Sequence, residues 1–170
     1  MKKIIIVTGS VIILAVIAVL FFKNTKKTGY INTYELYDQF KLKKELEDKL
    51  KKTQLSRQSL LDSIKAKLQF TIGNPALSDQ ERSEKASALK ESYYMKEKQF
   101  DQENQAQVQQ YDDQVWEQLN QYVKEYGKEK NYKYILGANG QGSLMYADEE
   151  TEITKEVLEF VNNKYDGKSK

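Results

Sequence analysis

Apolar residues recur in steps of three and four along most of this 170-residue chain, and the positions between them are mainly Lys, Glu, Asp and Gln. That spacing gathers the apolar side chains on one face of a helix and leaves the opposite face solvated. A first stretch carries Leu42, Leu46, Leu50, Leu60 or Leu61, Ile64, Leu68 and Ile72. A second carries Leu89, Tyr93, Phe100, Val108, Tyr111, Val115, Leu119, Tyr122 and Tyr126. The pattern predicts two long helices within residues 34–130, the first over 34–72.

A helix stop and a helix start separate the two stretches. Gly73 can take the left-handed conformation that ends a helix, and Pro75, the only proline of the chain, cannot continue one. Ser78 and Glu81 then fit a capping box. The sequence therefore predicts an antiparallel helical hairpin, an arm over residues 34–130 with its tip near 73–78.

The two ends of the chain have strand character. Residues 29–33 read as one strand, with Asn32 as the cap of the helix that follows, while 132–136 and 143–146 read as a hairpin around Asn139-Gly140. A last helix is expected over about 151–164. Since the arm returns the chain to its start, these parts predict a three-stranded sheet with a C-terminal helix, formed by residues 28–33 and 131–170 and called the body below. The expected interior residues are Ile31, Ile135, Leu144, Tyr146, Ile153, Val157 and Val161. A body this small favours self-association.

The run from Ile4 to Phe22 contains no charged residue. At about 1.5 Å per residue it reaches roughly 28 Å, close to the thickness of a bilayer core. No small-residue cleavage site follows it, which favours an uncleaved signal anchor over residues 1–27 rather than a removed signal peptide. Lysines flank both ends, so the orientation is less marked. A short cytoplasmic start would leave residues 28–170 outside the inner membrane.

Composition excludes several kinds of chemistry. The 27 basic and 25 acidic residues give +2, but five lysines flank the apolar start, so the balance from Thr28 onward is −3. Such a field does not favour nucleic acid. The chain has no Cys and no His. Disulfides, thiolate nucleophiles, Ser-His-Asp triads and the usual zinc or haem ligand sets are therefore excluded, and neither a cofactor nor an enzyme activity is expected.

Several short motifs at the two ends carry a resemblance. They are residues 29–33 followed by Leu36 and Phe40, Tyr134-Ile135-Leu136, Leu144-Met145-Tyr146-Ala147-Asp148, and Ile153-Thr154 with Val157-Leu158. With the membrane-targeting start and the long charged hairpin, this order of parts resembles the Skp (OmpH-like) family of periplasmic chaperones over about residues 29–165.

The resemblance implies a homotrimer whose arms surround a cavity that holds unfolded outer-membrane proteins without ATP. The expected function is thus an ATP-independent holdase of the cell envelope, in the periplasm and anchored to the inner membrane. Classical members are strongly basic and soluble, whereas this chain is about −3 beyond its start. Whether the lysines between Lys41 and Lys52 bind lipid or acidic clients, or form a solvated helix face, therefore stays open.

Candidate contact residues follow from the two helical stripes. Tyr94 and Met95 fall off the stripe and Phe70 lies near the tip, so these three are the candidates for client binding. Tyr93 and Phe100 fit the seam between the helices, and Trp116 fits packing near the base. The predicted oligomerisation residues of the body are Ile31, Ile135, Leu144 and Tyr146.

Two further patterns have ordinary interpretations. The glycines at 137–142 lack the spacing of a phosphate loop, and the acidic residues at 148–152 lack that of a calcium loop. They read as a turn and as the start of a helix. An alternative function for the whole chain is a membrane-anchored coiled-coil protein that bridges to a fixed envelope partner.

Overall fold

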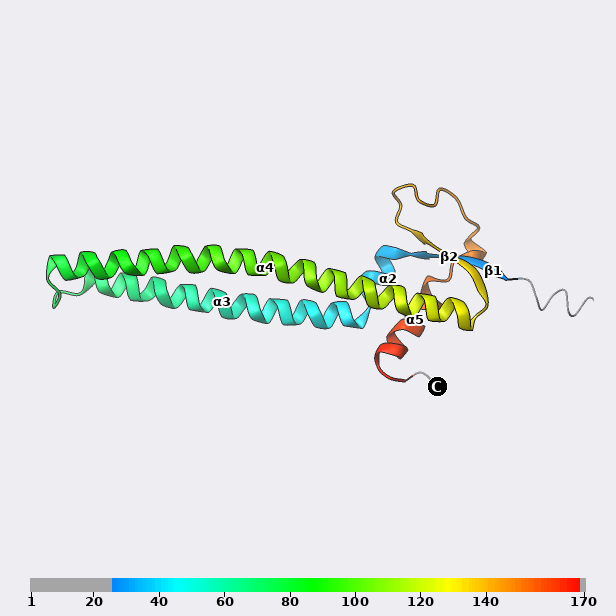
Figure 1. Ribbon diagram of the computed structural model, residues 1–170, viewed down its shortest axis with the longest axis horizontal. Coiled ribbons are helices and arrows are strands. Elements are labelled where there is room, and N and C mark those ends of the chain that lie inside the picture. Colours follow the sequence, from blue (N-terminus) through cyan, green and yellow to red (C-terminus); the bar gives the residue numbers. More distant parts are fainter. Residues whose placement is uncertain (1–25, 169–170) are drawn as a thin grey trace, which may run out of the picture.

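The computed structural model describes residues 26–168 as a long helical hairpin joined to a small mixed base (Figure 1). The elements, in chain order, are β1 Lys27–Asn32, α2 Thr33–Gln39, α3 Lys41–Gly73, α4 Asp79–Glu129, β2 Tyr132–Ala138, the 3₁₀ turn η1 Glu149–Thr151 and α5 Thr154–Tyr165. The protein is thus mostly helical, as the apolar spacing predicted.

The predicted membrane span from Ile4 to Phe22 lies outside the described residues. Over residues 26–168, no helix combines the length and the apolar character that crossing a bilayer requires.

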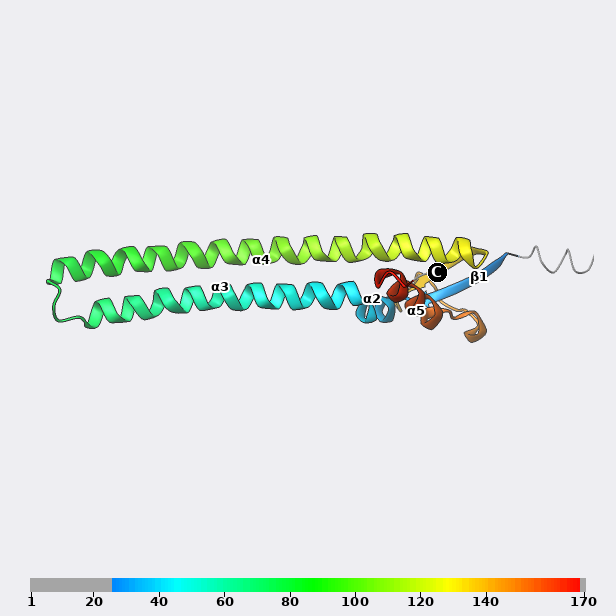
Figure 2. The ribbon, with the colours of Figure 1, turned by 90° about the horizontal axis from the view of Figure 1, so that it is seen from below.

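The arm consists of α3 and α4, which run antiparallel along their whole shared length (Figures 1 and 2). The 33 residues of α3 and the 51 of α4 correspond to roughly 50 and 76 Å at 1.5 Å per residue. The extra length of α4 continues past the start of α3 and packs against α2, α5 and β2. One continuous helix therefore connects the tip of the arm with the base.

The first helix is broken where the sequence predicted continuity. Asn32 caps α2, because its side-chain oxygen accepts from the backbone N–H of Tyr34 at 3.1 Å and of Glu35 at 3.2 Å. The helix stops at Phe40, which is extended with φ −71° and ψ 130°, and α3 begins at Lys41. No Gly or Pro marks this break in the sequence. The prediction of one helix over 34–72 is wrong because tertiary packing draws Phe40 inward.

Phe40 lies at the centre of the base and is fully buried. Its ring meets those of Tyr122 on α4 and Tyr165 on α5 edge-on, at centroid distances of 6.3 and 5.6 Å. Asn162 of α5 supports the break, since its side-chain oxygen accepts from the Lys41 N–H at 2.9 Å. The junction of arm and base thus holds together α2, α3, α4 and α5.

Among residues 26–168 the sheet has two parallel strands, whereas the sequence predicted three. β1 pairs with β2 in the register Gly29↔Ile135 and Ile31↔Gly137. The predicted hairpin strand at 143–146 is wrong. Asn139 accepts from the Gln141 N–H and the Ser143 hydroxyl, which holds a local turn in place of a returning strand. On the other side of β1, Tyr30 forms an isolated bridge with Glu152.

The core lies where the base meets the arm. Its buried apolar residues are Ile31, Leu36, Phe40, Leu42, Leu46, Val115, Leu119, Tyr126, Ile153, Val157 and Val161. The predicted burial of Ile31, Ile153, Val157 and Val161 is therefore confirmed. Ile135 and Leu144 are only partly buried, and Tyr146 is 85% exposed, so its predicted place inside is wrong for the single chain. The missing third strand explains the exposure of Tyr146.

Phe40→Ala is expected to destabilise the base by about 3–5 kcal/mol, because it removes a fully buried ring from its contacts with Tyr122 and Tyr165 and leaves a cavity. Chemical denaturation followed by circular dichroism at fixed protein concentration measures the effect. Phe70→Ala, which removes a ring that is 74% exposed, is the matched control and should change stability by less than about 0.5 kcal/mol. Equal losses for both variants would contradict a core centred on Phe40.

The base should also lose stability in alkali. Burial raises the pKa of Tyr126 to about 12, and the hydrogen bond to Glu45 together with burial raises the pKa of Tyr165 to about 12. The unfolded chain ionises these phenols near pH 10, so their stabilising contribution is complete below about pH 10 and is lost as pH rises toward 12. Far-UV circular dichroism against pH measures this transition. Tyr126→Phe should make the alkaline decline shallower, and an unchanged decline would contradict the assignment.

Candidate functional site: the exposed residues of the arm

The tip of the arm is a tight turn fixed by its own side chains. α3 continues through Gly73, and Asn74 ends it with φ −80° and ψ 110°, so the left-handed end predicted at Gly73 is wrong. The capping box is confirmed: Ser78 Oγ accepts from the Glu81 N–H at 3.3 Å, and the Glu81 carboxylate accepts from the Ser78 N–H at 3.1 Å. The hydrogen bonds from the Ser78 side chain and backbone hold the pKa of Glu81 below its usual value. The two helices are therefore joined with a defined geometry.

The seam between the helices is apolar at both ends. Leu42, Leu46 and Leu61 of α3 are buried, as are Ala86, Val115, Leu119 and Tyr126 of α4. Leu61 rather than Leu60 occupies the seam. Ile72 and Val108, which the spacing assigned to it, are 51% and 49% exposed, so those two assignments are wrong.

A polar cluster occupies the seam at mid-arm. Arg57 reaches across from α3, pairs with Glu103 at 2.7 Å and donates to Asn104 and Gln107. Its guanidinium carbon lies 5.6 Å from the centroid of the Phe100 ring. The arginine side chain is 19% exposed. Hydrogen bonds thus fix the relative register of the helices where apolar contact is sparse.

The three residues predicted to contact clients all lie on the surface of the arm. Phe70 is 74% exposed, and Tyr94 and Met95 are each 66% exposed. Tyr93 is partly buried and donates to Glu97 at 3.2 Å, which agrees with its predicted place at the seam. Exposure makes Phe70, Tyr94 and Met95 available, but the structure does not bring them to one point.

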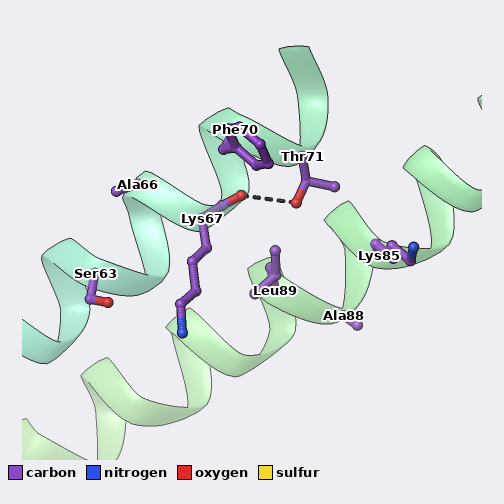
Figure 3. Close-up of a pocket in the computed structure, with 8 residues that line it drawn as sticks. All are labelled: Ser63, Ala66, Lys67, Phe70, Thr71, Lys85, Ala88 and Leu89. Carbon is purple, nitrogen blue, oxygen red and sulfur yellow. Dashed lines mark hydrogen bonds between the residues drawn. The ribbon is translucent and has the colours of Figure 1, made fainter. Parts of the chain in front are cut away.

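Phe70 and Tyr94 belong to separate grooves between the helices. The first groove, with a volume of about 670 Å³, is lined by Ser63, Ala66, Lys67, Phe70, Thr71, Lys85, Ala88 and Leu89 (Figure 3). The second, of about 330 Å³, is lined by Lys65, Leu68, Lys90, Tyr93 and Tyr94. The two sets share no residue. Each groove combines apolar side chains with one lysine from each helix.

Sequence reasoning missed other exposed apolar residues. Leu55 on α3 is 62% exposed, and Met145 in the loop after β2 is 86% exposed. The position of Leu55, between Leu50 and Leu61 but out of step with both, was a signal available from the spacing. The exposure of Met145 was not foreseen, because residues 143–146 were predicted to form a strand.

Trp116 packs at the base of the arm, as predicted. Its ring stacks on Tyr37 with centroids 5.0 Å apart and planes 28° apart. Tyr37 in turn donates a hydrogen bond to Asp112. Burial, followed by this hydrogen bond, raises the pKa of Tyr37 well above its usual value. These contacts attach α2 to α4.

The acidic residues after the loop form a helical turn. Asp148 accepts from the Glu150 N–H at 3.2 Å and so caps η1. Within residues 26–168, no group of three or more carboxylates, Cys or His gathers as a metal site.

The lysines between 41 and 52 divide into two groups. Lys41 pairs with Asp166, and Lys43 lies 2.8 Å from Glu47 and 3.3 Å from Asp38. The hydrogen bond to Glu47 raises the pKa of Lys43. The lysines at 44, 49, 51 and 52 are exposed, which agrees with a solvated helix face.

Comparison with known proteins identifies the family. The family model described as "Outer membrane protein (OmpH-like)" matches residues 27–161, which span the arm and nearly all of the base. The chain belongs to the OmpH-like family.

A solved OmpH-like structure shares this fold. The crystal structure of an OmpH-like protein from Caulobacter crescentus CB15, described as a candidate outer membrane chaperone, superposes with a TM-score of 0.58 at 15% sequence identity. The match covers 82% of this chain and 86% of that one. Among curated proteins, none matches the sequence. The family and the arm together support a chaperone role for this OmpH-like chain.

Arg57→Ala should loosen the middle of the arm, because it leaves Glu103 and Asn104 without their cross-helix partner. We expect amide hydrogen exchange around residues 53–61 and 100–107 to become about tenfold faster, the effect of losing roughly 1.4 kcal/mol of local stability. Lys52→Ala, at an exposed position of the same helix, is the control. Equal exchange in both variants would contradict a fixing role for Arg57.

Proposed function

We propose that this protein is an ATP-independent holdase chaperone that binds unfolded outer-membrane proteins in the cell envelope and prevents their aggregation. Membership of the OmpH-like family supports a chaperone role, as does the name of the Caulobacter protein with the same fold. The holdase mechanism and the class of client are our inference from the arm.

The observation that carries the proposal is the exposure of large apolar side chains along a thin, polar arm. Phe70, Tyr94, Met95 and Leu55 protrude from two helices that share only a narrow seam. A surface of this kind offers many weak contacts that are spread along the arm. It therefore suits a chain without a fixed fold. Such binding needs no catalytic group, and the chain has neither Cys nor His.

Self-association through the body forms the second part of the proposal. Within the described chain, β2 has β1 as its only neighbour, and a two-stranded sheet is marginal alone. Tyr134 and Leu136 on β2 are 56% and 43% exposed, and Tyr146 in the loop after β2 is 85% exposed. We infer that copies meet there as a homotrimer, with residues 28–33 and 131–170 as the oligomerisation body. Its proposed residues are Ile31, Ile135, Leu144 and Tyr146, and the arms formed by α3 and α4 would surround the client.

The apolar start completes the proposed arrangement. With residues 1–27 as an inner-membrane anchor, the arms would lie in the periplasm, and tethering would raise their concentration where unfolded chains emerge. With the start removed, the same assembly would be a free periplasmic protein.

The decisive experiment measures light scattering when a urea-unfolded β-barrel protein is diluted into buffer without nucleotide. The full chain at several-fold molar excess should suppress aggregation. Replacing Phe70, Tyr94 and Met95 together by Ser should weaken suppression several-fold, because it removes exposed apolar contacts while sparing the core. Replacing three exposed and uncharged arm residues, Gln54, Gln69 and Gln102, by Ser is the matched control, because it alters the arm composition without removing apolar side chains or charge.

Absence of suppression by the unaltered chain would reject the proposal. A stoichiometric complex with one folded envelope protein, together with indifference to unfolded barrels, would instead support the bridging function.

A further inference from the structure

We propose that the groove beside Phe70 is a docking site for client segments in which an apolar side chain is flanked by Asp or Glu. The inference rests on the proposed function and gives it a preferred ligand chemistry.

The shape of the groove suits one protruding apolar side chain. Phe70 forms an exposed wall, and Leu89 projects from α4 toward α3 (Figure 3). Ala66 and Ala88 also line the groove and contribute only small side chains to it. The Thr71 hydroxyl donates to the Lys67 carbonyl at 2.9 Å, so this hydroxyl is engaged within α3. The groove has a volume of about 670 Å³ and is wide open to solvent, so the side chain of an extended segment can enter it from the surface of the arm.

The positive charge of the groove favours client segments with acidic residues on either side of the inserted apolar side chain. Lys67 of α3 and Lys85 of α4 line it, and among the described residues none of those lining it is acidic. Within residues 26–168 neither lysine lies in an ion pair. Glu81, one turn before Lys85, is engaged in the capping box with Ser78, and the charge of Lys85 makes a smaller contribution to lowering the pKa of Glu81. Two lysine ammonium groups are thus available to carboxylates on either side of an inserted apolar side chain.

The second groove provides an internal contrast. It also carries a lysine from each helix, Lys65 and Lys90. Neither of these lysines lies in an ion pair within residues 26–168. A carboxylate does lie beside this groove, because its lining residue Tyr93 donates to Glu97, and that bond, with a smaller contribution from the charge of Asp62, raises the pKa of Tyr93. At about 100° per residue, Phe70 and Lys65 point some 140° apart on α3, so the two grooves lie on different sides of the arm. Lys65 and Lys90 therefore supply a matched pair for mutation.

The test compares two fluorescent peptides that differ only in charge. One alternates Asp with Tyr and Phe, and the other replaces every Asp by Lys. Binding to the full chain in its native assembly is measured by fluorescence anisotropy at low ionic strength, where exposed charges are least screened. The acidic peptide should bind about fivefold more tightly, since each exposed ion pair contributes only a fraction of a kcal/mol to about 1 kcal/mol.

The double variant K67Q/K85Q should weaken binding of the acidic peptide about three- to tenfold and remove the preference between peptides. K65Q/K90Q makes the same change of charge at the same level of the arm and should alter binding less than about twofold. Phe70→Ala should weaken both peptides. Circular dichroism of each variant checks that the arm is intact.

Equal losses for the two double variants, or no loss for either, would overturn the groove assignment. So would binding of phosphatidylglycerol vesicles through Lys67 and Lys85 with no binding of the acidic peptide, because the groove would then be a lipid-headgroup site. The aggregation assay, run in parallel, separates the two proposals. Intact suppression with equal peptide binding overturns only the groove assignment, whereas failed suppression by the unaltered chain overturns the proposed function itself.

Discussion

The burial of Phe40 is the contact on which the rest of the structure depends. This ring lies where α2 ends and α3 begins, and it packs edge-on against Tyr122 of α4 and Tyr165 of α5. Withdrawing it from a continuous helix gives up local hydrogen bonds and gains a fully buried aromatic contact among four helices. The chain therefore bends at Phe40, where the arm meets the base. This bend fixes the positions at which α3 and α4 leave the base.

Much of the architecture could be predicted from local signals in the sequence. The steps of three and four predicted the helices, and Pro75 with Ser78 and Glu81 predicted the tip. The break at Phe40 could not be foreseen, because it arises from contacts with residues more than eighty positions away and no local breaker marks it. The strand predicted at 143–146 failed for a related reason. The alternating pattern of this segment is typical of a strand, but a strand also needs a neighbouring strand to pair with. Residues 26–168 of the single chain place none beside residues 143–146.

The sequence predicted which residues of the candidate site are exposed, but it did not predict how they are arranged on the arm. Tyr94 and Met95 lie off the helical stripe and Phe70 lies near the tip, and both facts could be read from the spacing of the sequence. The placement of Phe70 and Tyr94 in separate grooves depends on how the helices are rotated against one another, and the polar cluster of Arg57, Glu103 and Asn104 contributes to that rotation. The thin seam leaves apolar side chains in solvent, and those side chains are the basis of the proposed chaperone function.

The parallel pairing of β1 with β2 has a consequence for how the chain folds. The two strands lie about a hundred residues apart, and closing so long a loop at random is entropically costly. Folding that begins at the tip lowers this entropic cost, because the capping box and the short turn allow α3 and α4 to pair progressively from that end. This pairing of the helices carries the distant strands toward each other before they pair. We therefore expect the arm to form first and to bring the parts of the base together. Pairing of β1 with β2 would then be a late step of folding.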